Sequence, residues 1–288
     1  MIAITRIDLS NAISHLNTIP NSMEMITMSI VKQFVGLHIG GSYESLLESI
    51  QLYQQGYNHF QIMLGPGKSL KLDNVTIGNV KGILEKYPDI IYHVHLALPV
   101  TAAGDKNDRP WKATLRYAVE ASHHCNILGI RNMVLHTGSN PHGIQSAYSN
   151  LMEFCWRFLM VTEGHNTVLC LENDVGSKKG TRMGHVPLLM KVVKEIGHPR
   201  IRLCLDTNHA WGNNWKFDIE NMNHVTKALE YTALVHLNSI PEECQKGGHV
   251  DRHSFTLLEE AHHCDPTFLA NIAKLASSRV INPLNSGL

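Results

Sequence analysis

Six potential metal ligands in this 288-residue sequence stand at equivalent points, each at the end of an apolar run or next to it. They are His38, His93, His136, Glu172, Asp206 and His236. A single histidine in such a place is more often a core or rim residue than a ligand. Independent scatter, however, does not put four histidines and two carboxylates at the ends of successive runs. We therefore expect these side chains to converge on one site.

The residue types indicate a catalytic metal site. Imidazoles mixed with carboxylates, without a thiolate, suit zinc or manganese with coordination positions left open for water or substrate. His209 lies three residues after Asp206, and the segment VDRHSF adds Asp251 and His253, which share one side of an extended chain. That segment also fits a solvated loop, because a short motif is only a hypothesis. His95 lies on the same strand face as His93 and competes with it as a ligand.

Eight short apolar runs position these residues, with amphipathic helical patterns such as residues 111–129 and 185–197 between them. Repeated alternation of strand and helix predicts one α/β domain, a (β/α)8 TIM barrel. A doubly wound open sheet is the alternative, but the first run is not followed by a glycine-rich phosphate loop. In a TIM barrel the reactive groups lie at the carboxyl ends of the strands. The runs cover residues 34–38, 59–64, 90–96, 132–136, 167–173, 201–206, 232–238 and 279–284.

The chain ends depart from a standard barrel. We assign residues 34–288 to the barrel and residues 1–33 to an N-terminal extension, and the C-terminus is short because few residues follow the last run. We expect the extension to cover apolar surface left by a missing final helix. A disordered tail, or a start at Met28, would also fit.

Composition limits the setting of the protein. The formal net charge is zero, and no apolar run approaches the roughly 20 residues of a membrane span. The six cysteines form no CxxC pair, which fits reduced core thiols. We therefore expect a monomeric, intracellular, cytoplasmic protein, in the host cell if the source is viral, that is neither secreted nor bound to a membrane.

Six stretches between about residues 34 and 253 resemble the endonuclease IV family of apurinic/apyrimidinic (AP) DNA endonucleases, a branch of the xylose isomerase-like TIM barrels. LDTNHA together with VDRH is the specific combination. The stretches are GLHIGGS at 36, VLHTGS at 134, LCLENDVGS at 169, LCLDTNHAW at 203, VHLNS at 235 and VDRH at 250.

The resemblance implies three Zn²⁺ ions, or Mn²⁺ in their place, and base excision repair as the function. Glu172 would be the catalytic carboxylate that bridges two ions. The implied reaction hydrolyses the backbone of double-stranded DNA 5′ to an abasic site and leaves a 3′-hydroxyl. The implied ligands are His93 and His136 for the first ion, Glu172, Asp206 and His236 for the second, and His209, Asp251 and His253 for the third.

The sequence departs from the family pattern in three places. Asn282 stands where the family ends its eighth strand on a glutamate, so this ligand is weak or lost. Leu96 stands where the family has a tyrosine after the first histidine ligand. The loop GPGKSLK replaces a stretch that contacts DNA. We expect phosphate contacts from Lys68, Lys71, Arg109 and Arg252, which would otherwise be ordinary solvated loop charges.

Two other functions remain open. A sugar isomerase or epimerase on the same barrel would need one ion and would leave His209 and VDRH unexplained. A weakened relative would bind abasic DNA without cleaving it efficiently, and Asn282 favours that alternative. About three ions per chain would indicate the nuclease, two the weakened relative and one the isomerase.

Overall fold

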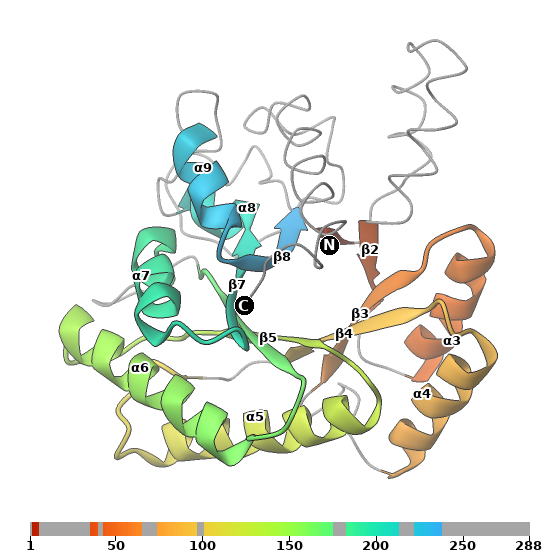
Figure 1. Ribbon diagram of the computed structural model, residues 1–288, viewed down its shortest axis with the longest axis horizontal. Coiled ribbons are helices and arrows are strands. Elements are labelled where there is room, and N and C mark those ends of the chain that lie inside the picture. The colour runs from red at the N-terminus through yellow and green to blue at the C-terminus, as the bar shows by residue number, and fades with distance from the viewer. Residues whose placement is uncertain are drawn as a thin grey trace.

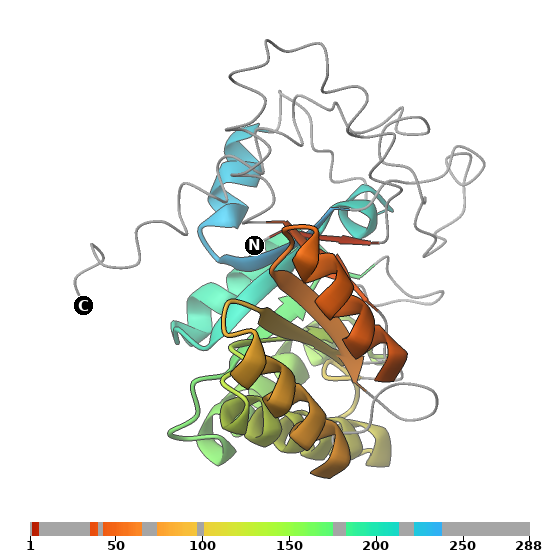
Figure 2. The ribbon, with the colours of Figure 1, turned by 90° about the vertical axis from the view of Figure 1, so that its right-hand side faces the viewer.

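The computed structural model describes residues 2–5, 35–39, 43–64, 74–96, 101–174, 183–212 and 222–237. Its parallel strands follow one another in chain order around a closed barrel, and β1 pairs with both β2 and β8. Figures 1 and 2 show helices packed outside the strands. The strands are β1 (Ile2–Thr5), β2 (Val35–His38), β3 (His59–Leu64), β4 (Ile91–Leu96), β5 (Asn132–His136), β6 (Val168–Glu172), β7 (Ile201–Asp206) and β8 (Thr232–Leu237).

A helix follows each strand from β2 to β7, which is the alternation expected of a TIM barrel. Local signals define several helix ends: Pro110 stands in the first turn of α5, and Gly197 ends α7 in the left-handed conformation. Within the described residues, no helix is long and apolar enough to cross a membrane. The helices are α3 (Tyr43–Gln54), α4 (Asn74–Lys86), α5 (Arg109–Ile127), α6 (Ile144–Val161), α7 (Val186–Ile196), α8 (Thr207–Gly212) and α9 (Met222–Leu229).

The barrel fold is confirmed, but its closing strand differs from the prediction. We expected the barrel to run from residue 34 and to close with a strand near residue 280, whereas Ile2–Thr5 fills the position between β8 and β2. Four residues of the predicted N-terminal extension therefore belong to the sheet. Residues 6–33 and 238–288, with the predicted strand at 279–284, lie outside the described residues.

Two apolar cores hold the barrel together. The larger one packs the helices against the outside of the sheet and includes Trp111 and Phe154. A smaller one fills part of the interior, where side chains two residues apart on a strand share a face. It consists of Val134, Val168, Cys170, Cys204 and Leu234. Continuing by two residues along β5, β6, β7 and β8 from this inner core leads to His136, Glu172, Asp206 and His236.

Candidate metal centre

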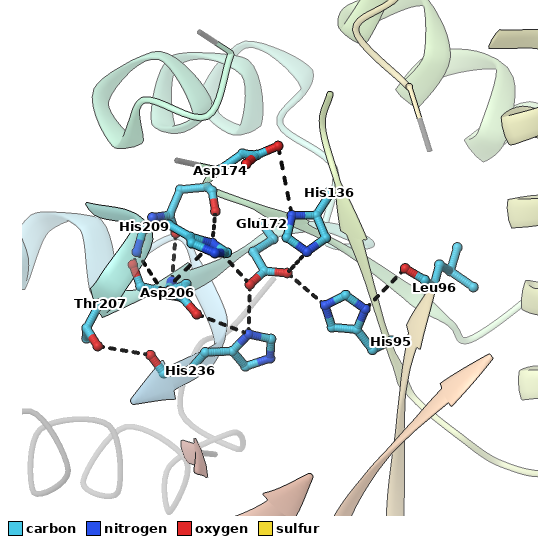
Figure 3. A network of polar contacts seen from close by, with 10 residues as sticks. His95, Leu96, His136, Glu172, Asp174, Asp206, Thr207, His209 and His236 are labelled. Atoms are coloured by element: carbon cyan, nitrogen blue, oxygen red, sulfur yellow. Dashed lines mark hydrogen bonds and ion pairs between the residues drawn. The ribbon is translucent and has the colours of Figure 1, made fainter. Parts of the chain in front are cut away.

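Four of the predicted strand-end residues, His136, Glu172, Asp206 and His236, meet at the carboxyl end of the barrel (Figure 3). The side chain of His38, at the end of β2, lies outside what the structure describes. His136 pairs in register with Glu172, and Asp206 pairs with His236. His209 enters from the first turn of α8, directly after β7. We call this set the upper cluster; its members are His95, His136, Glu172, Asp206, His209 and His236.

Glu172 is the centre of the upper cluster (Figure 3). Its Oε2 atom lies 2.9 Å from Nε2 of His95 and 3.3 Å from Nε2 of His136. Its Oε1 atom lies 2.8 Å from Nδ1 of His236 and 3.6 Å from Nδ1 of His209. Both oxygens of one carboxylate therefore face two imidazoles each.

In the upper cluster, burial and the neighbouring charges shift the pKa values of Glu172 and His236 in opposite directions. Burial alone would raise the pKa of Glu172, but the imidazoles of His136 and His236 hold that pKa well below its ordinary value. Burial would lower the pKa of His236, whereas Glu172 and then Asp206 raise it above the ordinary value. The pKa of His95 is lowered, mainly by burial, although Glu172 partly offsets this. The cluster thus combines carboxylate charge with an imidazole, His95, that resists protonation.

Two observations test whether a metal ion fits these residues. Nε2 of His236 is buried and has no hydrogen-bond partner among the described residues. His95 has an acceptor at each ring nitrogen, the carbonyl oxygen of Leu96 at 3.1 Å from Nδ1 and Glu172 at 2.9 Å from Nε2. A neutral imidazole carries one N–H and one ring-nitrogen lone pair. If Nδ1–H donates to Leu96, the Nε2 lone pair faces the Glu172 oxygen, an arrangement that a cation bound to both would stabilise. Donors of this kind fit zinc or manganese.

The ligand atoms fall into two groups of three, and Glu172 belongs to both. One group joins Glu172 to His95 and His236, and the other joins it to His136 and His209. This division differs from the predicted one, which placed His209 with the third ion. Asp206 lies beside both groups, with its carboxylate 3.8 Å from Nδ1 of His209 and 3.7 Å from Nδ1 of His236.

Of the two competing histidines on β4, His95 lies in the upper cluster beside Glu172. His93 lies below the upper cluster, where its Nε2 is 3.3 Å from Nδ1 of His59 and its Nδ1 is 3.1 Å from Nδ2 of Asn132. The Asn132 amide donates to Nδ1, so Nε2–H of His93 donates to His59. Both nitrogens are then engaged. We call the two stacked rings of His59 and His93 the lower pair; Asn132 is its hydrogen-bond partner.

The remaining predicted residues have different outcomes. Arg109 is exposed at the first residue of α5. In the seam between β1 and β8, Ala3 pairs in register with His236. The predicted ligands Asp251, His253 and Asn282 and the predicted phosphate contacts Lys68, Lys71 and Arg252 lie outside the described residues.

Two residues beside Glu172 entered no prediction. Asn173 contacts Asp206 and His209, and Oδ2 of Asp174 lies 4.0 Å from Nδ1 of His136. Their position directly after the strand-end Glu172 in LEND was the available signal. The prediction took Glu172 as the polar end of this run and considered neither residue after it.

Comparisons with known proteins give a family and a fold. The sequence profile of the xylose isomerase-like TIM barrel family matches residues 51–265. A protein of Mycoplasma mobile described as probable endonuclease 4 is 29% identical over 198 residues, which cover 65% of this chain and 68% of that protein.

Two solved structures share the fold. Endonuclease IV from Thermus thermophilus superposes with a TM-score of 0.61 at 20% identity, covering 78% of this chain and 83% of that one. A D-tagatose 3-epimerase-like protein gives a TM-score of 0.58 at 17% identity, covering 71% and 76%. Both an endonuclease and an epimerase-like protein therefore share this architecture.

Proposed function

The chain belongs to the xylose isomerase-like TIM barrel family, and we propose that within it this protein is a zinc-dependent AP endonuclease of base excision repair. It would hydrolyse the phosphodiester 5′ to an abasic site in double-stranded DNA and leave a 3′-hydroxyl. The similarity to probable endonuclease 4 of Mycoplasma mobile supports this substrate class. The resemblance of LDTNHA and VDRH to endonuclease IV supports it from the sequence.

The observation that carries the proposal is that Glu172 belongs to two ligand groups. A carboxylate with two imidazoles at each oxygen suits a bridge between two ions better than a single-ion site. Bound there, divalent ions would supply positive charge beside a phosphate oxygen and would acidify a water molecule. His95, His136, His209 and His236, with Glu172 and Asp206, would hold them. Asp251 and His253 remain the proposed ligands of a third ion.

The chain's own side chains would prepare this chemistry. Glu172 stays ionised because His136 and His236 hold its pKa low, so its negative charge is available to cations near neutral pH. Burial of the cluster lowers the local dielectric and strengthens each of these interactions. Arg109, exposed at the start of α5, would contact a DNA phosphate, as would Lys68, Lys71 and Arg252.

Two alternatives each have one observation in their favour. The likeness to a D-tagatose 3-epimerase-like protein keeps a single-ion sugar epimerase open. Asn282, which stands where the family has a glutamate, favours a weakened nuclease.

Metal analysis together with two activity assays separates the alternatives. The purified protein is analysed for bound zinc and manganese, and is then assayed on a duplex with one abasic site, on the undamaged duplex and on D-tagatose. About three ions with nicking confined to the abasic duplex is the expected result. One ion with epimerisation of the sugar would replace the proposal by the epimerase, and two ions with binding but no nicking would replace it by the weakened relative.

A further inference from the structure

We propose that Asn173 is a positioning residue of the metal centre: it holds Asp206 and His209 in the orientation that ligation requires. This inference rests on the proposed metal dependence and adds a residue that touches the ligands without belonging to either ligand group. It follows from the contacts of the Asn173 side chain and of its backbone carbonyl.

The side chain of Asn173 clamps the backbone of Asp206 at both of its polar groups. Nδ2 of Asn173 donates to the carbonyl oxygen of Asp206 at 2.8 Å, and Oδ1 accepts from the Asp206 N–H at 2.7 Å. Both residues are buried, with 1% and 0% of their surface exposed. Asp206 ends β7, so these bonds fix the last residue of that strand against the end of β6.

The backbone carbonyl of Asn173 selects the tautomer of His209. Nδ1 of His209 lies 2.8 Å from this oxygen, which can only accept, so Nδ1 carries the proton. The lone pair of a neutral His209 is then on Nε2. A ligating histidine commonly donates its other N–H to a carbonyl or carboxylate, and such contacts fix the ring orientation. The backbone N–H of His209 also donates to Oδ1 of Asp206, at 2.8 Å.

The chain around Asn173 is held from the other side as well. Gly184 packs so closely on Asp174 that a Cβ atom at residue 184 would overlap the Asp174 backbone. The N–H of Asn173 donates to the carbonyl oxygen of Cys204 at 3.4 Å, which continues the pairing of β6 with β7. Asn173 therefore links the Asp206 backbone and the His209 ring in one fixed arrangement.

Asn140 provides a matched control. It is completely buried, and its amide also makes one bond to a carbonyl oxygen, that of Ala103 at 3.0 Å, and one to a backbone N–H, that of His142 at 2.9 Å. The first bond joins the loops after β4 and β5, the second lies within the loop after β5, and neither touches a member of the upper cluster. Asn140→Ala thus removes a buried amide with the same two kinds of hydrogen bond, but one that makes neither bond with the upper cluster.

The test measures Co²⁺ binding to the full chain without DNA, by competition with a chromophoric chelator and by the visible absorption of the bound cobalt. We expect Asn173→Ala to weaken Co²⁺ binding about 10- to 100-fold and to change the absorption spectrum, as loss of an outer-shell contact does. Asn140→Ala should retain wild-type affinity and spectrum. Circular dichroism establishes that each variant is folded.

Asn173→Asp covers the case in which Asn173→Ala does not fold. It keeps the acceptor for the Asp206 N–H and replaces the donor by an oxygen that repels the Asp206 carbonyl. Its added negative charge alone would tighten cation binding, so weaker Co²⁺ binding in this variant indicates lost positioning. Unchanged or tighter binding, equal losses in Asn140→Ala, or a wild-type protein that binds no cobalt would each overturn the inference. A wild-type protein that binds cobalt but does not nick abasic DNA would overturn the proposed function alone.

Discussion

The upper cluster and the lower pair are two groups of histidines in one barrel, two residues apart along β4; the upper cluster is buried, whereas in the lower pair His93 is buried and His59 is partly exposed. His95 belongs to the first and His93 to the second, and their side chains share one face of the strand. In the upper cluster the carboxylates of Glu172 and Asp206 raise the pKa of His236. In the lower pair, burial and then the neighbouring His59 lower the pKa of His93 well below its ordinary value.

The difference shows that carboxylates oppose the effect of burial on a histidine pKa: they prevail at His236 and only partly offset burial at His95. In the lower pair, the rings of His59 and His93 contact each other, Asn132 donates to His93, and burial favours the neutral form of His93. In the upper cluster, the imidazoles surround the Glu172 carboxylate (Figure 3), and a buried nitrogen of His236 has no partner among the described residues. Four experiments test this contrast.

Removing the central carboxylate should have the largest effect. We expect Glu172→Gln to weaken metal binding by more than about 100-fold, beyond the usual cost of an outer-shell change, and to abolish nicking. The neutral amide can neither balance the cations nor hold four imidazoles. Metal content after dialysis and an abasic-site nicking assay measure this. Glu85→Gln, the same change at an exposed position on α4, is the control. Wild-type nicking by Glu172→Gln would refute the shared-carboxylate site.

Exchanging the two β4 histidines for alanine should separate the clusters. His95→Ala should weaken metal binding at least about tenfold, because it removes a ligand of the upper cluster. His93→Ala should keep the metal and lower the free energy of unfolding by about 1–3 kcal/mol, since it leaves the Asn132 amide without its acceptor. Equilibrium dialysis and urea unfolding give the two quantities. The reverse pattern would make His93 the ligand.

His93 of the lower pair and His236 of the upper cluster should respond to pH in opposite directions in protein freed of metal by a chelator. His93 has a folded pKa below the unfolded value of about 6.5, so its contribution to stability is present above that pH and is lost as the pH falls. His236 has a raised folded pKa, so its contribution is present at low pH and is lost as the pH rises through that pKa.

Urea unfolding of wild type, His93→Gln and His236→Gln between pH 5 and 8 measures both contributions. The free energy of unfolding of wild type minus that of His93→Gln should decrease by at most about 1.4 kcal/mol for each pH unit below pH 6.5. The difference for His236→Gln should change with the opposite sign. Curves that run parallel for all three proteins would contradict the assigned protonation states.

A change outside both clusters should have the smallest effect. Arg109→Ala is expected to weaken binding to an abasic duplex a few-fold and to reduce the salt dependence by about one counterion, because one phosphate contact is lost. Metal content should not change, since Arg109 is exposed at the start of α5. Lys86→Ala, at the other end of the barrel on α4, serves as the control in fluorescence anisotropy.

The sequence predicted most of the barrel because parallel strands that are buried on both faces read as continuous apolar runs. Val168–Glu172 and Ile201–Asp206 are strands of this kind, and their polar last residues marked the site. The choice between His93 and His95 could not be made in this way, since a period of two puts both on one face. The contacts between strands distinguish them: His95 lies 2.9 Å from Glu172 on β6, whereas His93, two residues earlier, contacts His59 on β3.

The closing strand escaped prediction for a different reason. Ile2–Thr5 has only four residues, and the helical pattern after it dominated the interpretation of the first 33 residues. Pairing with β8 is a tertiary property that local sequence does not carry. The role of Asn173 likewise depends on a contact with Asp206 on another strand.

The pairing of β1 with β8 also bears on how the barrel is assembled. Ile2 lies beside Val235, so the last seam of the sheet joins segments from nearly opposite ends of the described chain. Contacts of such high sequence separation raise the contact order, and they form slowly because the entropy of a long loop is lost before the contact is gained. During synthesis β1 emerges first and waits for β8, the last strand of the described sheet. His236 stands in that strand, so the upper cluster is complete only once this seam can form.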